Sequence, residues 1–255
     1  MSAQVPVPTQ IPAPPPVPAP APTDFAVRAS ELMTTDLPRV LQRVERRVLH
    51  VMDIAAQPDT AWQDEQIRRA AGAIRDNANE PLYVAELAAD DARQLHEMAR
   101  QAYWRGGNAR EAHALQLKAF GANPLDAVIA SSLAFLSLRQ LPPQADMARQ
   151  MALYSLSLHE ARNPDGRIED WTTLAIASAL SGRDRDARNA WFVSLALAPQ
   201  PERQCRAAIS AYAKHGERVR SSIEAMLYRA YASGRAPGSA LCEWPPYWMA
   251  QRPMR

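Results

Sequence analysis

Two stretches of equal length decide the fold: residues 93–126, RQLHEMARQAYWRGGNAREAHALQLKAFGANPLD, and residues 168–201, IEDWTTLAIASALSGRDRDARNAWFVSLALAPQP. Aligned without a gap, they share a frame in which every matched position lies 75 residues after its counterpart. The matched pairs are His96 and Trp171, Ala99 and Leu174, Tyr103 and Ser178, Gly107 and Gly182, Ala112 and Ala187, Gln116 and Trp191, Ala119 and Ser194, and Pro124 and Pro199. Self-similarity at a fixed spacing indicates an internal repeat.

The residue types at these matched positions each have a physical reason. Gly107 and Gly182 stand where the chain must turn between two helices, and glycine adopts positive φ there without steric cost. Ala112 and Ala187 are small enough for two helices to approach closely. The closing prolines disfavour helix in the residue before them and so end each unit. The frame therefore predicts pairs of antiparallel helices.

Both stretches resemble the tetratricopeptide repeat, a helix–turn–helix unit with a period of about 34 residues. Arg100 and Ala175 stand where that family carries glycine on its first helix. Residues 127–160 form a looser unit with a long second helix and a loop at 163–166, and a degenerate fourth unit follows from Cys205 to Tyr231. The resemblance implies an all-α solenoid, in which at least about three units bury a continuous core.

Composition agrees with an all-α fold and divides the chain into four parts. The 255 residues are 47% hydrophobic, and nine of the 22 prolines fall within the first 22 residues. Consecutive prolines favour extended polyproline II, so this segment is a spacer or, alternatively, a ligand for an aromatic groove. The predicted parts are a disordered proline-rich arm at 1–30, an N-terminal helical pair at 31–80, a tetratricopeptide-like array at 81–236, and an aromatic, proline-containing tail at 237–255.

The helical pair has recognisable starts. Asp36 is the expected N-cap of the first helix, with Pro38 in its first turn, where the missing N–H costs nothing. Thr60 and Gln63 have the spacing of a capping box, which places the start of the second helix at Thr60.

No motif in the sequence indicates catalysis, a metal site or a cofactor. The chain has no phosphate-binding glycine loop, no serine in a nucleophile elbow and no histidine pair at zinc-ligand spacing. Cys205 and Cys242 stand alone, which is typical of a reducing compartment. No signal peptide or apolar run long enough for a membrane span is present, so we expect a cytoplasmic protein, or an envelope-associated one if a leader has been removed.

The tetratricopeptide resemblance implies a concave groove lined by the first helix of each unit. The expected lining residues are Glu97, Gln101, Trp104, Arg105, Ser131, Phe135, Leu138, Thr172 and Ile176. Relatives that clamp a terminal carboxylate use Lys and Asn, which are missing at these positions. The remaining groove is suited to an apolar helix or an extended peptide segment. Alternatively, the N-terminal helices, residues 36–78, fill it.

These observations favour a non-catalytic protein–protein adaptor, with no cofactor and no membrane insertion. The chain resembles small bacterial repeat proteins that act as accessory subunits of secretion, pilus or envelope-polysaccharide assemblies. The alternative is a regulatory protein that binds nucleic acid or an effector through Arg39, Arg43 and Arg47, which share one helix face. A net charge of only +2 argues against a dedicated nucleic-acid binder. The oligomeric state stays open.

Overall fold

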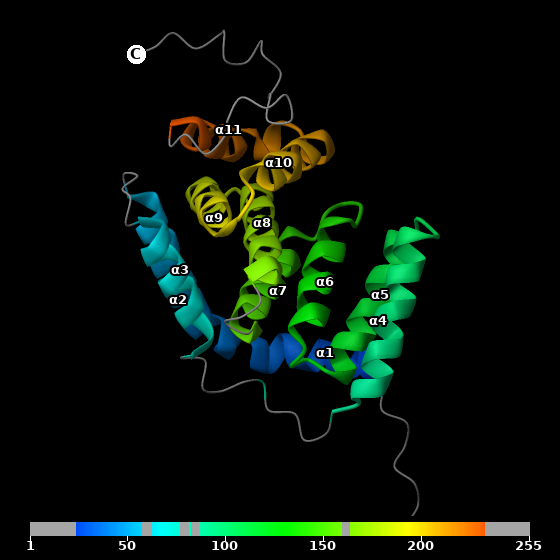
Figure 1. The fold of residues 1–255 in the computed structure, drawn as a ribbon. Coiled ribbons are helices and arrows are strands. Elements are labelled where there is room, and N and C mark those ends of the chain that lie inside the picture. The colour runs from blue at the N-terminus through cyan, green and yellow to red at the C-terminus, as the bar shows by residue number, and fades with distance from the viewer. Residues whose placement is uncertain (1–23, 58–62, 77–81, 83–86, 160–163, 233–255) are drawn as a thin grey trace, which may run out of the picture.

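The computed structural model describes residues 24–57, 63–76, 82, 87–159 and 164–232, and the regular elements across these residues are all helical (Figure 1). In chain order they are α1 Phe25–Glu31, the π-helical segment η1 Leu32–Asp36, α2 Leu37–Ala56, α3 Gln63–Asp76, α4 Ala89–Trp104, α5 Ala109–Ala122, α6 Ala127–Leu138, α7 Ala145–Leu158, α8 Pro164–Leu180, α9 Asp184–Leu197, α10 Pro201–His215 and α11 Glu217–Ala232. The all-α prediction is confirmed. Among the described helices, none is both long and apolar enough to cross a membrane. The predicted tail at 237–255 and most of the predicted arm lie outside the described residues.

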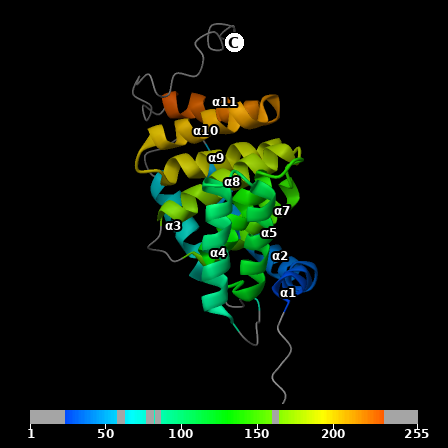
Figure 2. The same ribbon diagram turned by 90° about the vertical axis from the view of Figure 1, so that its right-hand side faces the viewer.

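Helices α4 to α11 form antiparallel pairs, α4 with α5, α6 with α7, α8 with α9 and α10 with α11, and successive pairs lie side by side (Figures 1 and 2). The matched helices α5 and α9 begin and end 75 residues apart, as the frame in the sequence requires. Gly107 and Gly182 have φ values of 63° and 72°, which confirms the predicted turns. Gly216, with φ of 57°, makes the corresponding turn between α10 and α11.

The core lies between the paired helices and continues under α1–α3, whose buried side chains belong to the same apolar cluster. Ala112, Ala187 and the indole rings of Trp171 and Trp191 are fully buried there. Small residues at the crossings allow close approach, and the large rings fill the space between pairs. Each buried side chain of this size contributes about 1.5–3 kcal/mol relative to exposure.

The second unit differs from its prediction in one respect. Helix α7, Ala145–Leu158, has 14 residues, the same length as α5 and α9, so the expected long second helix is wrong. The additional residues fall instead between α7 and α8 and in the first turn of α8, which begins at Pro164. Proline is tolerated in a first turn because its absent N–H has no partner there, so residues 164–166 are helical and not a loop.

The first helix begins earlier than the sequence predicts. Asp24 is the N-cap of α1, and its side chain accepts hydrogen bonds from the backbone N–H groups of Ala26 and Val27 at 2.9 and 3.4 Å. Helical backbone then continues through η1 into α2, and Asp36 makes no side-chain cap. The assignment of Asp36 as N-cap is therefore wrong, and so is the extension of the disordered arm over residues 25–30.

The corner between α2 and α3 uses Gln63 in a role that differs from a capping box. Gln63 is buried, and its Nε2 donates to the carbonyl oxygens of Ile54 and Gln57 at 2.8 and 2.9 Å. Its Oε1 accepts from Arg229 of α11 at 2.7 Å. This side chain closes the end of α2 and joins the corner to the last helix, because the final carbonyls of a helix need donors from elsewhere. Thr60 lies outside the described residues.

The N-terminal helices cover the second helices of the repeats. Helix α1 packs on α5, while α2 and α3 pack on α7 and α9. The buried stripe of α2, including Val44, Val48 and Val51, supplies the apolar contact, and an ion pair from Arg149 of α7 to Glu45 reinforces it. The alternative in which residues 36–78 fill the groove of the first helices is therefore wrong for the described part of that segment.

Helices α1 and α5 touch through backbone atoms at Gly121. A Cβ atom added to Gly121 would lie 1.9 Å from the carbonyl oxygen of Phe25 and 3.1 Å from the amide nitrogen of Ala29. No side chain fits between these two helices, so the glycine sets how closely α1 approaches.

We predict that Gly121→Ala destabilises the protein, although alanine ordinarily stabilises a helix by about 1 kcal/mol over glycine. The added methyl group collides with backbone, and overpacking of this kind costs about 1–3 kcal/mol. Urea denaturation should show a lower free energy of unfolding, and amide hydrogen exchange should accelerate in α1. A variant as stable as the wild type, with unchanged exchange in α1, would contradict this contact.

Candidate functional site

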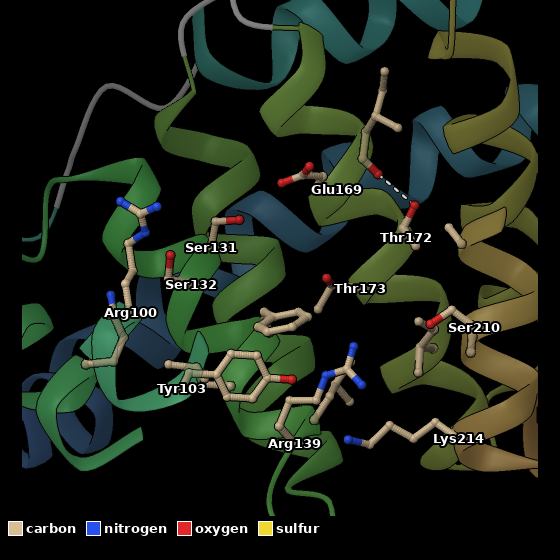
Figure 3. Close-up of a pocket in the computed structure, with 18 of the residues that line it drawn as sticks. Arg100, Tyr103, Ser131, Ser132, Arg139, Glu169, Thr172, Thr173, Ser210 and Lys214 are labelled. Atoms are coloured by element: carbon tan, nitrogen blue, oxygen red, sulfur yellow. Dashed lines mark hydrogen bonds between the residues drawn. The ribbon is translucent and has the colours of Figure 1, made fainter. Parts of the chain in front are cut away.

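A cavity of about 590 Å³ opens on the helices that α1–α3 leave uncovered (Figure 3). Its lining comes from α4, α6, α8 and α10, the first helix of each pair, with Gln116 of α5 at its floor. Residues three or four positions apart lie on one helix face, so each helix presents a single stripe to the cavity. We call this cavity and its lining the groove.

The groove contains six of the nine residues that the sequence predicts for it. Those brought together are Trp104, Ser131, Phe135, Leu138, Thr172 and Ile176. Glu97, Gln101 and Arg105 do not line it. Helix α4 presents the stripe that contains Arg100 and Tyr103 instead, and Glu97 accepts hydrogen bonds from Arg100 at 3.0 Å and Gln101 at 3.2 Å on the exposed side.

An aromatic cluster forms one end of the groove. The Trp104 ring stacks on Phe135 with centroids 6.3 Å apart and planes 21° apart, and Tyr103 meets both rings edge to face at 4.8 and 5.5 Å. Trp104 nevertheless remains 71% exposed. Indole rings are usually well buried in folded proteins, so this exposure is informative.

Hydrogen bonds between neighbouring helices hold the groove walls in place. The hydroxyl proton of Thr172 in α8 is shared between two acceptors: the Ile168 carbonyl of the same helix at 2.9 Å, the bond drawn in Figure 3, and Gln204 Oε1 of α10 at 3.1 Å. Beside it, Glu169 pairs with Arg203 of α10 at 2.9 Å. These contacts fix α8 and α10 relative to each other across the groove.

Hydrogen bonds also fix the part of the groove that α4, α5 and α6 form. Gln116 Nε2 donates to the Ile129 carbonyl at 2.9 Å, and His96 Nδ1 lies 2.9 Å from Gln116 Oε1. The amide nitrogen is the donor to Ile129, so the amide oxygen accepts from His96. One glutamine thus joins α4, α5 and α6.

Two cations face each other at the corner next to the aromatic cluster. Arg139 lies over the Phe135 ring, 4.6 Å from its centroid, and Lys214 of α10 points toward it from the opposite wall (Figure 3). Partial burial, and then the charge of Arg139, hold the pKa of Lys214 below its usual value. Burial, reinforced by the same two cations, lowers the pKa of His215 to about 4, so this imidazole is neutral at physiological pH. We call Arg139 and Lys214 the cationic corner.

The contribution of α10 to the groove is absent from the sequence prediction. A helical stripe was nevertheless readable in that segment. Arg203, Ala207, Ser210 and Lys214 recur at steps of four, three and four, and all line the groove. The fourth unit departs most from the repeat pattern, so the resemblance does not predict its groove face.

A buried Ser–His–Asp cluster lies between α7 and α8. His159 Nε2 is 2.7 Å from Asp170 Oδ2 and 3.2 Å from Ser155 Oγ. In a nucleophilic triad the serine and the carboxylate contact opposite ring nitrogens, whereas here both contact Nε2. Ser155 and Asp170 are also fully buried, so this cluster joins two helices and offers no nucleophile to a substrate. Elsewhere among the described residues, no group of histidine, cysteine and carboxylate side chains is arranged to hold a metal ion.

Asp170 makes the stability of the fold depend on pH. Burial raises the pKa of its carboxyl above 3.8, and the contact with His159 opposes part of that shift. A raised folded pKa contributes stability that is complete below the unfolded pKa and declines as the pH rises. Asp170→Asn removes this titration. Its free energy of unfolding should therefore improve relative to wild type as the pH rises from about 4, the ordinary carboxyl pKa, to the raised pKa of the folded state.

Urea denaturation across that pH range measures the effect, with Asp91→Asn on the exposed side of α4 as the matched control. The control should follow the wild-type pH profile. Parallel profiles for Asp170→Asn and wild type would show that burial of this carboxyl has no such consequence.

Comparisons with protein-family models, with curated proteins and with solved structures found no match to this chain.

The exposure of Trp104 predicts a strong contrast between tryptophans. Trp104→Ala should change the free energy of unfolding by about 1 kcal/mol or less, since it removes only surface aromatic contacts. Trp191→Ala, at a fully buried position, should cost about 3–5 kcal/mol. Chemical denaturation measures both, and equal losses would mean that Trp104 belongs to the core.

Proposed function

We propose that this chain is a non-catalytic, tetratricopeptide-like adaptor that binds a segment of a partner protein in the groove. The observation that carries the proposal is the aromatic cluster, where Trp104 is 71% exposed and stacked on Phe135. Tryptophan is enriched among the residues that dominate protein–protein binding energy. An exposed ring that is already held by its neighbours loses little conformational freedom when a partner covers it.

The shape of the groove supports a peptide-like partner. A volume of about 590 Å³, lined by four successive helices, has room for several side chains of a bound segment. The lining combines apolar side chains, such as Phe135 and Ile176, with the hydroxyl groups of Ser132 and Ser210 (Figure 3). Apolar surface provides affinity and hydroxyl groups bind backbone amides, a combination suited to a helix or an extended segment.

The position of the N-terminal helices α1–α3 supports the same proposal. Because α1–α3 pack on the second helices α5, α7 and α9, they leave the groove-facing residues of the first helices uncovered. On the arginine face of α2, Arg47 Nη1 donates to the Ile74 carbonyl of α3 at 3.3 Å and so contributes to the packing of that pair.

Site-specific photo-crosslinking tests the proposal. Val128 is 52% exposed and lines the groove, whereas Tyr228 of α11 is 77% exposed and does not. A benzoylphenylalanine photo-crosslinker at position 128 should capture a defined partner from the lysate of the source organism, and the same label at position 228 should not. Adding Trp104→Ala should remove the crosslink at position 128 with an unchanged circular dichroism spectrum. Equal capture at both positions, or none at position 128, would contradict groove binding.

A further inference from the structure

Resting on the adaptor function proposed above, we propose that the partner segment is acidic and amphipathic. An internal Asp or Glu side chain of the partner lies between Arg139 and Lys214, and a neighbouring apolar side chain packs on Trp104 and Phe135. The segment is thus defined by a carboxylate next to an apolar anchor.

The cationic corner carries an excess of positive charge. Within the described part of the chain, no carboxylate pairs with Arg139 or with Lys214. The two charges come from different helices, α6 and α10, and approach each other inside the groove (Figure 3). Like charges brought together in a partly desolvated site repel, and an anion between them removes the repulsion.

The other groove arginines are already neutralised. Arg100 pairs with Glu97 at 3.0 Å, and Arg203 pairs with Glu169 at 2.9 Å. The contrast localises the unbalanced charge to one corner and does not spread it along the groove. A long polyanion is therefore a poorer match than a segment with one or two carboxylates.

The arginine of this corner is also held in place before a partner arrives. Its guanidinium lies over the Phe135 ring, which in turn stacks on Trp104. A carboxylate that binds Arg139 thus places its neighbouring side chains against the same aromatic cluster. A fixed guanidinium forms strong, directional bonds with a carboxylate, so the charge and apolar contacts reinforce one another.

Neither end of the chain outside the described residues is acidic overall, although residues 233–255 include one acid beside an aromatic residue, Glu243 and Trp244. Residues 1–23 contain no charged side chain, and residues 233–255 contain three arginines against the single acid Glu243. A basic tail is repelled by a cationic corner, and an uncharged arm leaves it unbalanced. Overall charge therefore favours a segment of another protein. Glu243→Gln in the selection described below separates the two occupants: a variant that binds the selected peptides more tightly than the wild type would show that the tail itself occupies the corner and would overturn the partner assignment.

Selection from a random 12-residue phage-displayed peptide library, with the full chain immobilised, tests this inference without assuming a sequence. The wild type should enrich peptides that carry Asp or Glu next to aromatic or aliphatic residues. Arg139→Gln/Lys214→Gln should lose the acidic enrichment and bind a selected peptide at least about tenfold more weakly. The control Arg206→Gln/Arg218→Gln removes two exposed arginines outside the groove and should behave as the wild type.

The outcomes separate the two proposals. Peptides that compete for the groove and depend on Trp104, but show no acidic bias, would overturn the acidic partner and leave the adaptor function standing. Acidic peptides that bind the double Gln variant as tightly as wild type would also overturn it. A library that yields no peptide above the blank support would count against peptide binding as a whole. Circular dichroism of each variant verifies folding.

Discussion

The packing of α1–α3 against α5, α7 and α9 is the interaction on which the rest of this structure depends. The array of paired helices has two faces, one formed by the first helix of each pair and one by the second, and α1–α3 cover the face of the second helices as a layer. The backbone contact between Phe25 and Gly121 and the Arg149–Glu45 ion pair fix where the layer lies. The uncovered stripes on α4, α6, α8 and α10 follow from that choice, because a layer bound to the second helices leaves the first helices to form a groove.

The groove itself is built from residues with separate tasks. Gln116 and Thr172 hold neighbouring helices together through hydrogen bonds, which keeps the walls at a fixed distance. Trp104 and Phe135 provide an apolar surface without contributing to the core. The charge is concentrated at the cationic corner, which lies against the aromatic cluster, so one end of the groove offers both an apolar and a basic contact. A groove whose two ends differ in this way gives a bound segment a preferred direction.

The sequence predicts the repeat pairs well and the contacts between distant segments poorly. Gly107 and Gly182 predict their turns correctly, because a positive φ is a local requirement that glycine meets without strain. The spacing of Gln63 from Thr60 predicts a capping box, but the hydrogen-bond partners of Gln63 come from α2 and α11, which lie far from it in the sequence or on another helix. Lys214 belongs to the groove only because α10 folds beside α8, and a spacing pattern within one helix does not tell which helix lies opposite.

The central claim is that α1–α3 cover one side of the repeat pairs and that the described residues leave the other side open. Hydroxyl-radical footprinting of the full chain, read by mass spectrometry, tests it most directly because it reports side-chain exposure in solution. Trp104 should oxidise at a rate typical of an exposed indole, while Met52, on the buried face of α2, and Phe120 of α5, which is also buried, should be protected. Protection of Trp104 together with rapid oxidation of Met52 and Phe120 would contradict the claim.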